Sequence, residues 1–354
     1  MSVARSIEVV VPDGISDPLR ASGGNTYDRR LCEELGNHGW AVQLREVPGP
    51  WPWANAESRA ALSSALAAAP EDSTVVVDGL VASACPEELV PAARRLQTVL
   101  LVHLPVGVGV DGVDREREAA VVRAAAAVIT TSDWTRRWLL HAYGLQPERV
   151  HVAHPGVDPA RPVEGSVEGG HLLCVGAVSS GKGQDALVAA LGGLVEADWR
   201  CDCIGPLDRA PDFVATLRQD IRDSGLQGRV RLVGPRTGAD LDAAYADADL
   251  LVLASRIETY GMVVTEALAR GLPVLAFDVG GVAEALGMTA AGTRPGVLVP
   301  SNDVAALTEA LRRWLDDASL RRRLRGAAAE RRTRLTGWGD TADLVARVLE
   351  AVAA

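Results

Sequence analysis

The sequence predicts an α/β protein with two domains, each built around a doubly wound parallel sheet. Three observations support this prediction. The chain has 354 residues, which exceeds the size at which a single hydrophobic core usually keeps growing. Short apolar runs alternate with helical patterns from one end to the other. These runs are apolar throughout, as is typical of parallel strands covered by helices on both faces.

Six strands are expected in the first part of the chain: "SIEVVVPDG", "WAVQLREV", "TVVVDGL", "TVLLVHL", "AVITTS" and "VHVAHPG". Helical patterns at 25–37, 54–68 and 114–126 lie between them. The second part repeats the scheme with "HLLCVGAV", "WRCDCIGP", "VRLVGPR", "LLVLASR", "PVLAFDV" and "GVLVP".

Residues 154–170 separate the two parts and are rich in Pro, Gly and Glu, which indicates a linker. We therefore expect one domain at 1–158 and a second at 159–335. The arginine-rich run "RRRLRGAAAERRTRL" is expected to form a solvated helix face, because acidic residues are interspersed in and around it. A last amphipathic helix at 336–354 has no strand after it, so we expect it to pack back on the first domain.

Composition excludes several classes of protein. The net charge is −10, and both parts are acidic, which argues against nucleic acid and, less strongly, against an anionic membrane surface as a partner. The five cysteines lack a paired framework or zinc spacing and are expected to be buried, reduced thiols. They are Cys32, Cys85, Cys174, Cys201 and Cys203. Neither a signal peptide nor a membrane-spanning run is evident, so a soluble cytoplasmic protein is expected.

Ligands of open parallel sheets bind at the carboxyl ends of the strands, and two such domains would hold a ligand in the cleft between them. After the first strand, Gly23 and Gly24 precede a helix, where they form either a phosphate-approaching turn or a simple tight turn. Lys182, the chain's only lysine, lies between two glycines at another helix start. A cation is unfavourable there unless an anion such as phosphate offsets the helix dipole.

A third loop carries two carboxylates, Glu258 and Glu266, eight residues apart across a strand-loop-helix junction. The free N–H groups of Thr259, Tyr260, Gly261, Met262 and Val263 lie between them. Such a junction suits a diphosphate on the backbone and sugar hydroxyls on the carboxylates. Glu266 falls within an apolar stretch, where an unpaired charge is rarely buried.

These segments resemble the retaining GT-B glycosyltransferases of family 4. "RIETYGMVVTEALARGLPVLAFDVGGVAEAL" is similar to the family's E-x7-E block, and "VGAVSSGKGQDALVAAL" is similar to its Lys-Gly donor loop. "TTSDWTRRWLLHAYGLQPERVHVAHPGVDP" resembles its interdomain segment, and "SGGNTYDRRLCEELGNHGWAV" resembles its first loop and helix. The resemblance covers about residues 6 to 350.

The resemblance implies sugar transfer from a nucleotide-diphosphate sugar, with retention at the anomeric carbon and no obligatory metal or other cofactor. An N-terminal acceptor domain and a C-terminal donor domain are implied. It assigns Lys182 to the donor diphosphate, Glu258 to the transferred sugar and Glu266 to the ribose. Backbone amides of 259–263 would cradle the phosphates, and Gly23 and Gly24 would approach them. His103 would lie near the reacting sugar.

One position departs from the family, because Ala177 stands where an arginine usually follows the Val-Gly of the donor loop. Arg256 or Arg236 is the expected substitute as a second phosphate cation. The alternative is a catalytically silent nucleotide-sugar binder or partner subunit.

The sequence leaves the substrates open. The donor is a UDP-, GDP-, ADP- or TDP-sugar, and the acceptor is expected to be a small soluble molecule. Trp51 and Trp53, on the loop after the second strand, either stack on the acceptor or cap the domain.

Overall fold

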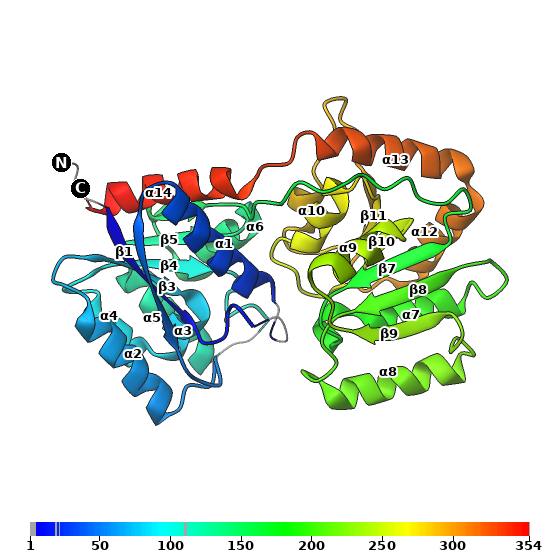
Figure 1. Ribbon diagram of the computed structural model, residues 1–354. Helices are drawn as coiled ribbons and strands as arrows, with labels where there is room; N and C mark the ends of the chain where they lie inside the picture. The colour runs from blue at the N-terminus through cyan, green and yellow to red at the C-terminus, as the bar shows by residue number, and fades with distance from the viewer. Residues whose placement is uncertain (1–4, 18–19, 21, 110–111, 354) are drawn as a thin grey trace. The chain divides into compact units, whose positions relative to one another are not determined.

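The computed structural model describes residues 5–17, 20, 22–109 and 112–353 (Figure 1). Its chain forms two compact units, one of Met1–Gly156 with Thr336–Ala354 and one of Val157–Leu335. Each unit contains a parallel sheet of six strands, and the twelve predicted strands are all found. The sequence-based prediction of two α/β sheets is therefore confirmed.

The sheet of the first unit has the strand order β2-β1-β3-β4-β5-β6. Its strands are β1 (Ser6–Pro12), β2 (Ala41–Val47), β3 (Thr74–Asp78), β4 (Gln97–Val102), β5 (Ala127–Thr130) and β6 (Val150–Val152). The helices are α1 (Gly23–Asn37), α2 (Ala56–Ala68), α3 (Gly79–Ala84), α4 (Pro86–Ala92), α5 (Val113–Ala124) and α6 (Asp133–Tyr143). The central strands are buried as predicted, whereas β2 is largely exposed because it lies at the edge.

The last helix, α14 (Trp338–Ala353), contacts α1 in the first unit. The rings of Tyr27 and Trp338 meet edge to face, with centroids 5.5 Å apart. The Thr341 hydroxyl donates to the carbonyl of His154 at 2.8 Å. The predicted return of the terminal helix to the first domain is confirmed.

The sheet of the second unit has the order β12-β11-β10-β7-β8-β9. Its strands are β7 (His171–Val175), β8 (Arg200–Ile204), β9 (Val230–Gly234), β10 (Leu250–Leu253), β11 (Val274–Asp278) and β12 (Gly296–Pro300). The helices are α7 (Gln184–Gly192), α8 (Pro211–Asp223), α9 (Gly238–Ala246), α10 (Met262–Ala269), α11 (Val282–Leu286), α12 (Val304–Asp316) and α13 (Ala318–Arg332). The chain leaves β7 toward β8 and β9, then returns to the other side of β7 with β10. The strand order therefore reverses between β7 and β10.

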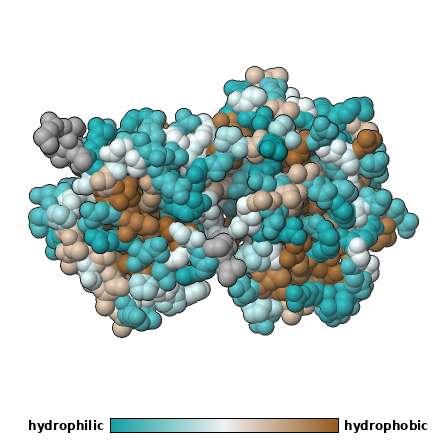
Figure 2. All heavy atoms as spheres, viewed as in Figure 1, coloured by the Kyte–Doolittle hydropathy of each residue, from teal (hydrophilic) through white to brown (hydrophobic). Residues whose placement is uncertain are grey.

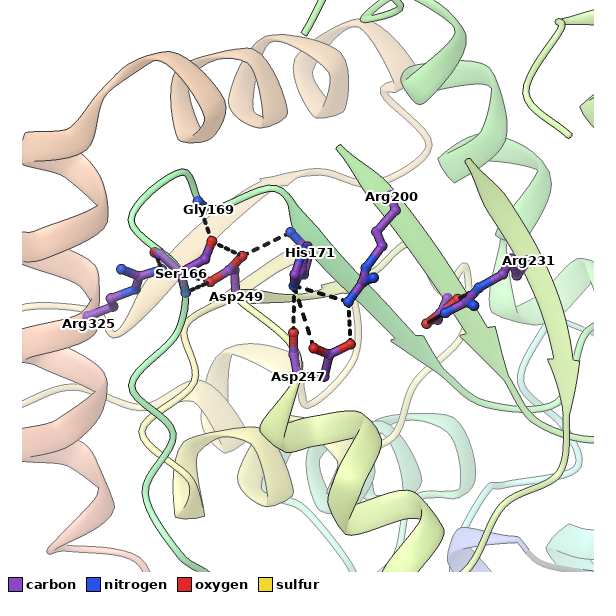
Figure 3. A network of polar contacts seen from close by, with 9 residues as sticks. Ser166, Gly169, His171, Arg200, Arg231, Asp247, Asp249 and Arg325 are labelled. Carbon is purple, nitrogen blue, oxygen red and sulfur yellow. Dashed lines mark hydrogen bonds and ion pairs between the residues drawn. The ribbon is translucent and has the colours of Figure 1, made fainter. Parts of the chain in front are cut away.

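The segment leading into β7 has no helix or strand, as a linker would, but it is fixed to the second unit (Figure 3). Asp249, which is almost fully buried, accepts hydrogen bonds from the Ser166 hydroxyl at 2.7 Å and the backbone N–H of His171 at 2.9 Å. Arg325 of α13 reaches the same carboxylate at 3.0 Å. The interpretation of 154–170 as a simple linker is therefore incomplete.

The arginine-rich helix α13 differs from its predicted role. Arg321 is buried and donates to the carbonyls of Trp314 and Leu315, both at 2.7 Å. Arg332 donates to the carbonyls of Ala269 and Ala160. The prediction of a solvated face is wrong for these side chains, because a guanidinium can donate to several carbonyls at once.

The cysteines agree with their prediction in part. All five are free; four are buried, and Cys32 is half-buried. Figure 2 shows polar residues over much of the visible face of both units, with hydrophobic patches among them.

Within the described residues, we find no helix with the length and apolar character needed to span a bilayer.

Candidate functional site

The strongest candidate site lies at the carboxyl ends of β7 and β10. The reversal of strand order between two adjacent parallel strands is where such sheets bind ligands. The loop after β7 carries Lys182, and the loop after β10 carries Glu258. The Lys182 Nζ and Glu258 Oε2 atoms are 2.6 Å apart, and the Ser255 hydroxyl lies 3.4 Å from the same oxygen. The structure thus brings together two of the three residues predicted as catalytic.

The loop that carries Lys182 is held in place by its own residues. A short 3-10 turn, Ser180–Lys182, leads to Gly183, whose φ is +67°. A Cβ atom on Gly183 would lie 1.9 Å from the carbonyl oxygen of Ala254, so only glycine fits there. The buried side chain of Gln184 donates to the carbonyl of Ala177 at 3.1 Å and also accepts a backbone N–H. The loop therefore rests directly on the end of β10.

Arg256 forms an ion pair with another residue of this site. Its guanidinium forms two hydrogen bonds to the carboxylate of Asp185, at 2.8 and 2.7 Å. Burial works to raise the pKa of Asp185, but the hydrogen bonds and charge of Arg256 outweigh it and lower that pKa. By contrast, Arg236 is exposed after β9 and has no side-chain partner among the described residues. The prediction that Arg256 acts as a second phosphate cation has no support from these contacts.

The helix α10 begins directly after the Glu258 loop. Gly261 precedes it with φ of +93°, and no side chain caps its first turn. The first N–H groups of a helix have no partner within the helix, and they carry its positive dipole end. The side chain of Tyr260 is buried, those of Met262 and Val263 are half-buried, and Thr259 precedes them in the loop. This stretch therefore offers backbone N–H donors at the start of α10.

Glu266 lies one turn into α10 and has the partner that its apolar surroundings require. The hydroxyl of Tyr245, from α9, donates to Glu266 Oε2 at 2.8 Å. Burial raises the pKa of Glu266, although the Tyr245 hydrogen bond and the charge of Arg270 oppose the rise. The guanidinium of Arg270 lies 4.3 Å from the centre of the Tyr245 ring. Tyr245 therefore fixes one carboxylate oxygen.

In the first unit, the predicted His103 lies in a cluster with two buried carboxylates. His103 Nε2 is 2.8 Å from Asp28 Oδ1 and 3.5 Å from Asp78 Oδ2. Asp78 ends β3, Asp28 lies in α1, and the Tyr27 ring meets the imidazole edge to face at 5.1 Å. The three ligand atoms lie within 4.8 Å of one another, a spacing that also suits a cation.

Burial and charge in this cluster raise the pKa values of both Asp78 and His103. Burial and the nearby charge of Asp28 raise the pKa of Asp78 to about 6. Burial by itself lowers the pKa of His103, but the charge and hydrogen bond of Asp28, with Asp78, outweigh it and raise that pKa. The imidazole therefore binds a proton more readily than an imidazole free in solution does.

The glycines and tryptophans predicted for the first unit fall in different settings. Gly23 and Gly24 open α1, whose start is capped by the Ser22 hydroxyl accepting from the N–H of Asn25. A Cβ on Gly24 would lie 3.2 Å from the His103 ring, so the helix packs closely on the imidazole. Trp51 donates to the carbonyl of Val47 at 3.0 Å and packs on the core. Trp53 is 78% exposed.

Four residues of the candidate site were not predicted from the sequence: Asp28, Asp78, Asp185 and Tyr245. Asp78 could have been found, since it ends the apolar run "TVVVD" at the carboxyl edge of the sheet. The other three lie within helical patterns that carry no such signal.

Two family profiles match consecutive parts of the chain. The profile described as Glycosyltransferase Family 4 matches residues 26–161. The profile described as Glycosyl transferases group 1 matches residues 161–331. The second match includes both loops that hold Lys182 and Glu258.

Curated relatives are similar over most of this chain. The D-inositol 3-phosphate glycosyltransferase of Kineococcus radiotolerans is 34% identical over 258 residues, 65% of this chain and 58% of that protein. The D-inositol 3-phosphate glycosyltransferase 1 of Catenulispora acidiphila is 33% identical over 279 residues, 72% of this chain and 65% of that protein. The matched region is thus less than two thirds of each relative's length.

Solved structures share the fold. The sucrose-phosphate synthase of Thermosynechococcus elongatus aligns with a TM-score of 0.80 and 21% identity over 98% of both chains. Anabaena Alr3699/HepE in complex with UDP-glucose aligns with a TM-score of 0.75 and 18% identity over 98% of this chain and 99% of that one. With both profiles matched in order and the same architecture, the chain belongs to the glycosyl transferases group 1, or family 4, and has the GT-B fold.

Proposed function

We propose that this protein is a retaining glycosyltransferase that moves a sugar from a nucleotide-diphosphate sugar to a small acceptor. The observation that carries the proposal is the Lys182–Glu258 pair at the point where the strand order reverses. An ammonium, a carboxylate and an uncapped helix start suit a sugar diphosphate, because each fits a different part of it. The relative Alr3699/HepE is described in complex with UDP and with UDP-glucose.

In this proposal, each residue has one task. Departure of the nucleoside diphosphate develops negative charge, which Lys182 and the N–H groups at the start of α10 stabilise in the transition state. Glu258 contacts the transferred sugar, and Glu266, oriented by Tyr245, takes the ribose hydroxyls. His103 in the first unit contacts the reacting sugar. The leaving phosphate accepts the acceptor's proton on the same face, so a separate protein base is unnecessary.

The Lys182–Glu258 contact has a consequence for donor binding. At 2.6 Å, Glu258 already neutralises the ammonium, so a diphosphate competes with a carboxylate of the protein for the same cation. Binding is favourable because the phosphates also gain the N–H groups of α10, while Glu258 gains sugar hydroxyls.

The domain roles and the acceptor follow from the same proposal. Residues 159–335 bind the donor and residues 1–158 bind the acceptor. The curated relatives are named for D-inositol 3-phosphate, so a small polyol or its phosphate is the first acceptor class to test. The exposed Trp53 offers a stacking surface for it.

The test is a calorimetric and thermal-shift panel of UDP, GDP, ADP and TDP with their common sugar conjugates. A ligand at a hundredfold excess over its Kd stabilises the native state by about 2.7 kcal/mol. We expect one nucleotide to bind wild type and to bind Lys182→Ala at least tenfold more weakly. The matched control is Arg322→Ala, which removes one exposed cation of the second unit that has no partner within the described part of the chain.

A second candidate function, a silent nucleotide-sugar binder, is motivated by Ala177. Donor hydrolysis and transfer to candidate acceptors separate the two. Binding without either reaction across the panel would support the silent binder. Absence of binding to every nucleotide would reject both functions.

A further inference from the structure

A second ion pair joins the two loops of the site. Asp185 lies three residues after Lys182, and Arg256 lies two residues before Glu258. Their contact is bidentate, at 2.8 and 2.7 Å, and each side chain is about one third exposed. Bidentate pairing of a guanidinium with a carboxylate fixes geometry as well as charge.

Arg256 also holds the turn that carries Lys182, because it donates hydrogen bonds to two backbone carbonyls of that turn. The N–H of Arg256 donates to the carbonyl of Gly181 at 2.8 Å, and its guanidinium donates to the carbonyl of Ser180 at 2.5 Å. These acceptors are the two residues immediately before Lys182. Together with its ion pair to Asp185, Arg256 thus contacts the chain on both sides of Lys182.

We propose that Asp185 and Arg256 are a positioning pair that holds Lys182 opposite Glu258, with Arg256 binding the loop and leaving the donor phosphates to Lys182. This proposal rests on the proposed donor site. The lysine side chain has four flexible carbons, so the position of its ammonium depends on where the turn is fixed. A shift of about 1 Å in such a group can lower the rate by about a hundredfold.

If Arg256 instead binds the donor phosphates, Asp185→Asn has the opposite effect on donor binding. If Arg256 left Asp185 to bind phosphate, Asp185→Asn would free a cation and tighten donor binding. If the pair positions Lys182, the same substitution loosens the turn and weakens donor binding. A single conservative variant therefore distinguishes the two roles by the sign of the change.

The position of Lys182 can be measured without any donor, since it is the only lysine. Reductive ¹³C-methylation labels this one side chain and the α-amine, and both keep their charge. The Lys182 methyl signal in Glu258→Gln defines the unpaired state. We expect Asp185→Asn and Arg256→Gln to move the wild-type signal toward that state. The charge-exchanged double variant Asp185→Arg with Arg256→Asp should restore it.

A matched control is the Asp202–Arg231 pair of the same unit, which is also bidentate but lies on β8 and β9. Asp202→Asn should leave the Lys182 signal unchanged. An unchanged signal in Asp185→Asn and Arg256→Gln would overturn the proposal.

Donor titration supplies the second measurement. We expect Asp185→Asn to bind the donor about tenfold more weakly and to be partly rescued by the charge exchange. Tighter donor binding by Asp185→Asn would overturn the positioning role. If wild type binds no nucleotide, the proposed function fails, while the donor-free methyl signals still decide whether the pair positions Lys182.

Discussion

Replacing Gly183 by alanine tests whether the lysine loop rests on β10 as closely as the structure indicates. The new Cβ would lie 1.9 Å from the carbonyl oxygen of Ala254, whereas real Cβ contacts essentially never fall below 3.0 Å. The loop carrying Lys182 or the end of β10 must therefore move by about 1 Å or more. Forcing an extra carbon into a packed site typically costs about 1–3 kcal/mol.

The control for this prediction is Gly225→Ala. Gly225 has the same φ of +67°, and nothing lies within 4 Å of its added Cβ. Both variants carry the cost of a left-handed alanine, roughly 1–2 kcal/mol, partly offset by a stiffer unfolded chain, roughly 0.4–1 kcal/mol. The difference between them isolates the clash.

The assay is urea unfolding of both variants, followed by far-UV circular dichroism and tryptophan fluorescence, with donor binding measured in parallel. We expect Gly183→Ala to lower the free energy of unfolding by about 1–3 kcal/mol more than Gly225→Ala. We also expect only Gly183→Ala to weaken donor binding. Equal stabilities within about 0.5 kcal/mol would show that the loop does not approach Ala254 as described.

Three further substitutions test other contacts. In Asp28→Asn, the pKa of His103 should fall, because burial lowers it and the main opposing group, Asp28, is no longer charged. In the wild type, the protonated imidazole contributes to the free energy of unfolding at low pH, and this contribution is lost as pH rises through the raised pKa. The variant should largely lose this contribution. Titration of the histidine ring signals by NMR measures this, and an unchanged His103 pKa would contradict the cluster. Tyr245→Phe should raise the pKa of Glu266 further and weaken nucleoside diphosphate binding about fivefold, by loss of one hydrogen bond worth about 1 kcal/mol. Calorimetry measures the affinity, and equal affinity in the variant and the wild type would contradict the role of Tyr245. Asp249→Ala should destabilise the chain by about 3 kcal/mol or more, since several half-buried donors lose their buried acceptor. A loss of unfolding free energy below about 1 kcal/mol in urea unfolding would exclude that role.

The predictions that held depend on local patterns. The apolar runs place all twelve strands, because a strand buried on both faces is apolar at every position. The position of Lys182 could also be predicted, since a cation between two glycines at a helix start is visible in the sequence. Glu258 was predicted from a different signal, a strand end followed by a helix, and the roles of both residues toward a donor stay predictions.

The predictions that failed concern long polar side chains. The run around Arg321 has the sequence pattern of a solvated helix face, yet the guanidinium of Arg321 donates hydrogen bonds to carbonyls of α12. The role of Arg256 or Arg236 as a second phosphate cation stays a prediction, and the structure pairs the guanidinium of Arg256 with Asp185, 71 residues away. Sequence spacing gives no information on which distant acceptor such a flexible side chain reaches.

The sequence by itself determined the two α/β sheets, the return of the last helix and the loops of the candidate site, because strand and helix periods and glycine turns are local properties. Tertiary structure alone decided which groups meet. The contacts of Lys182 with Glu258 and of His103 with Asp28 depend on strand order, which joins residues 76 and 75 positions apart. The raised pKa of the half-buried His103 follows from its contacts and from burial, and it is not encoded in any single stretch of the chain.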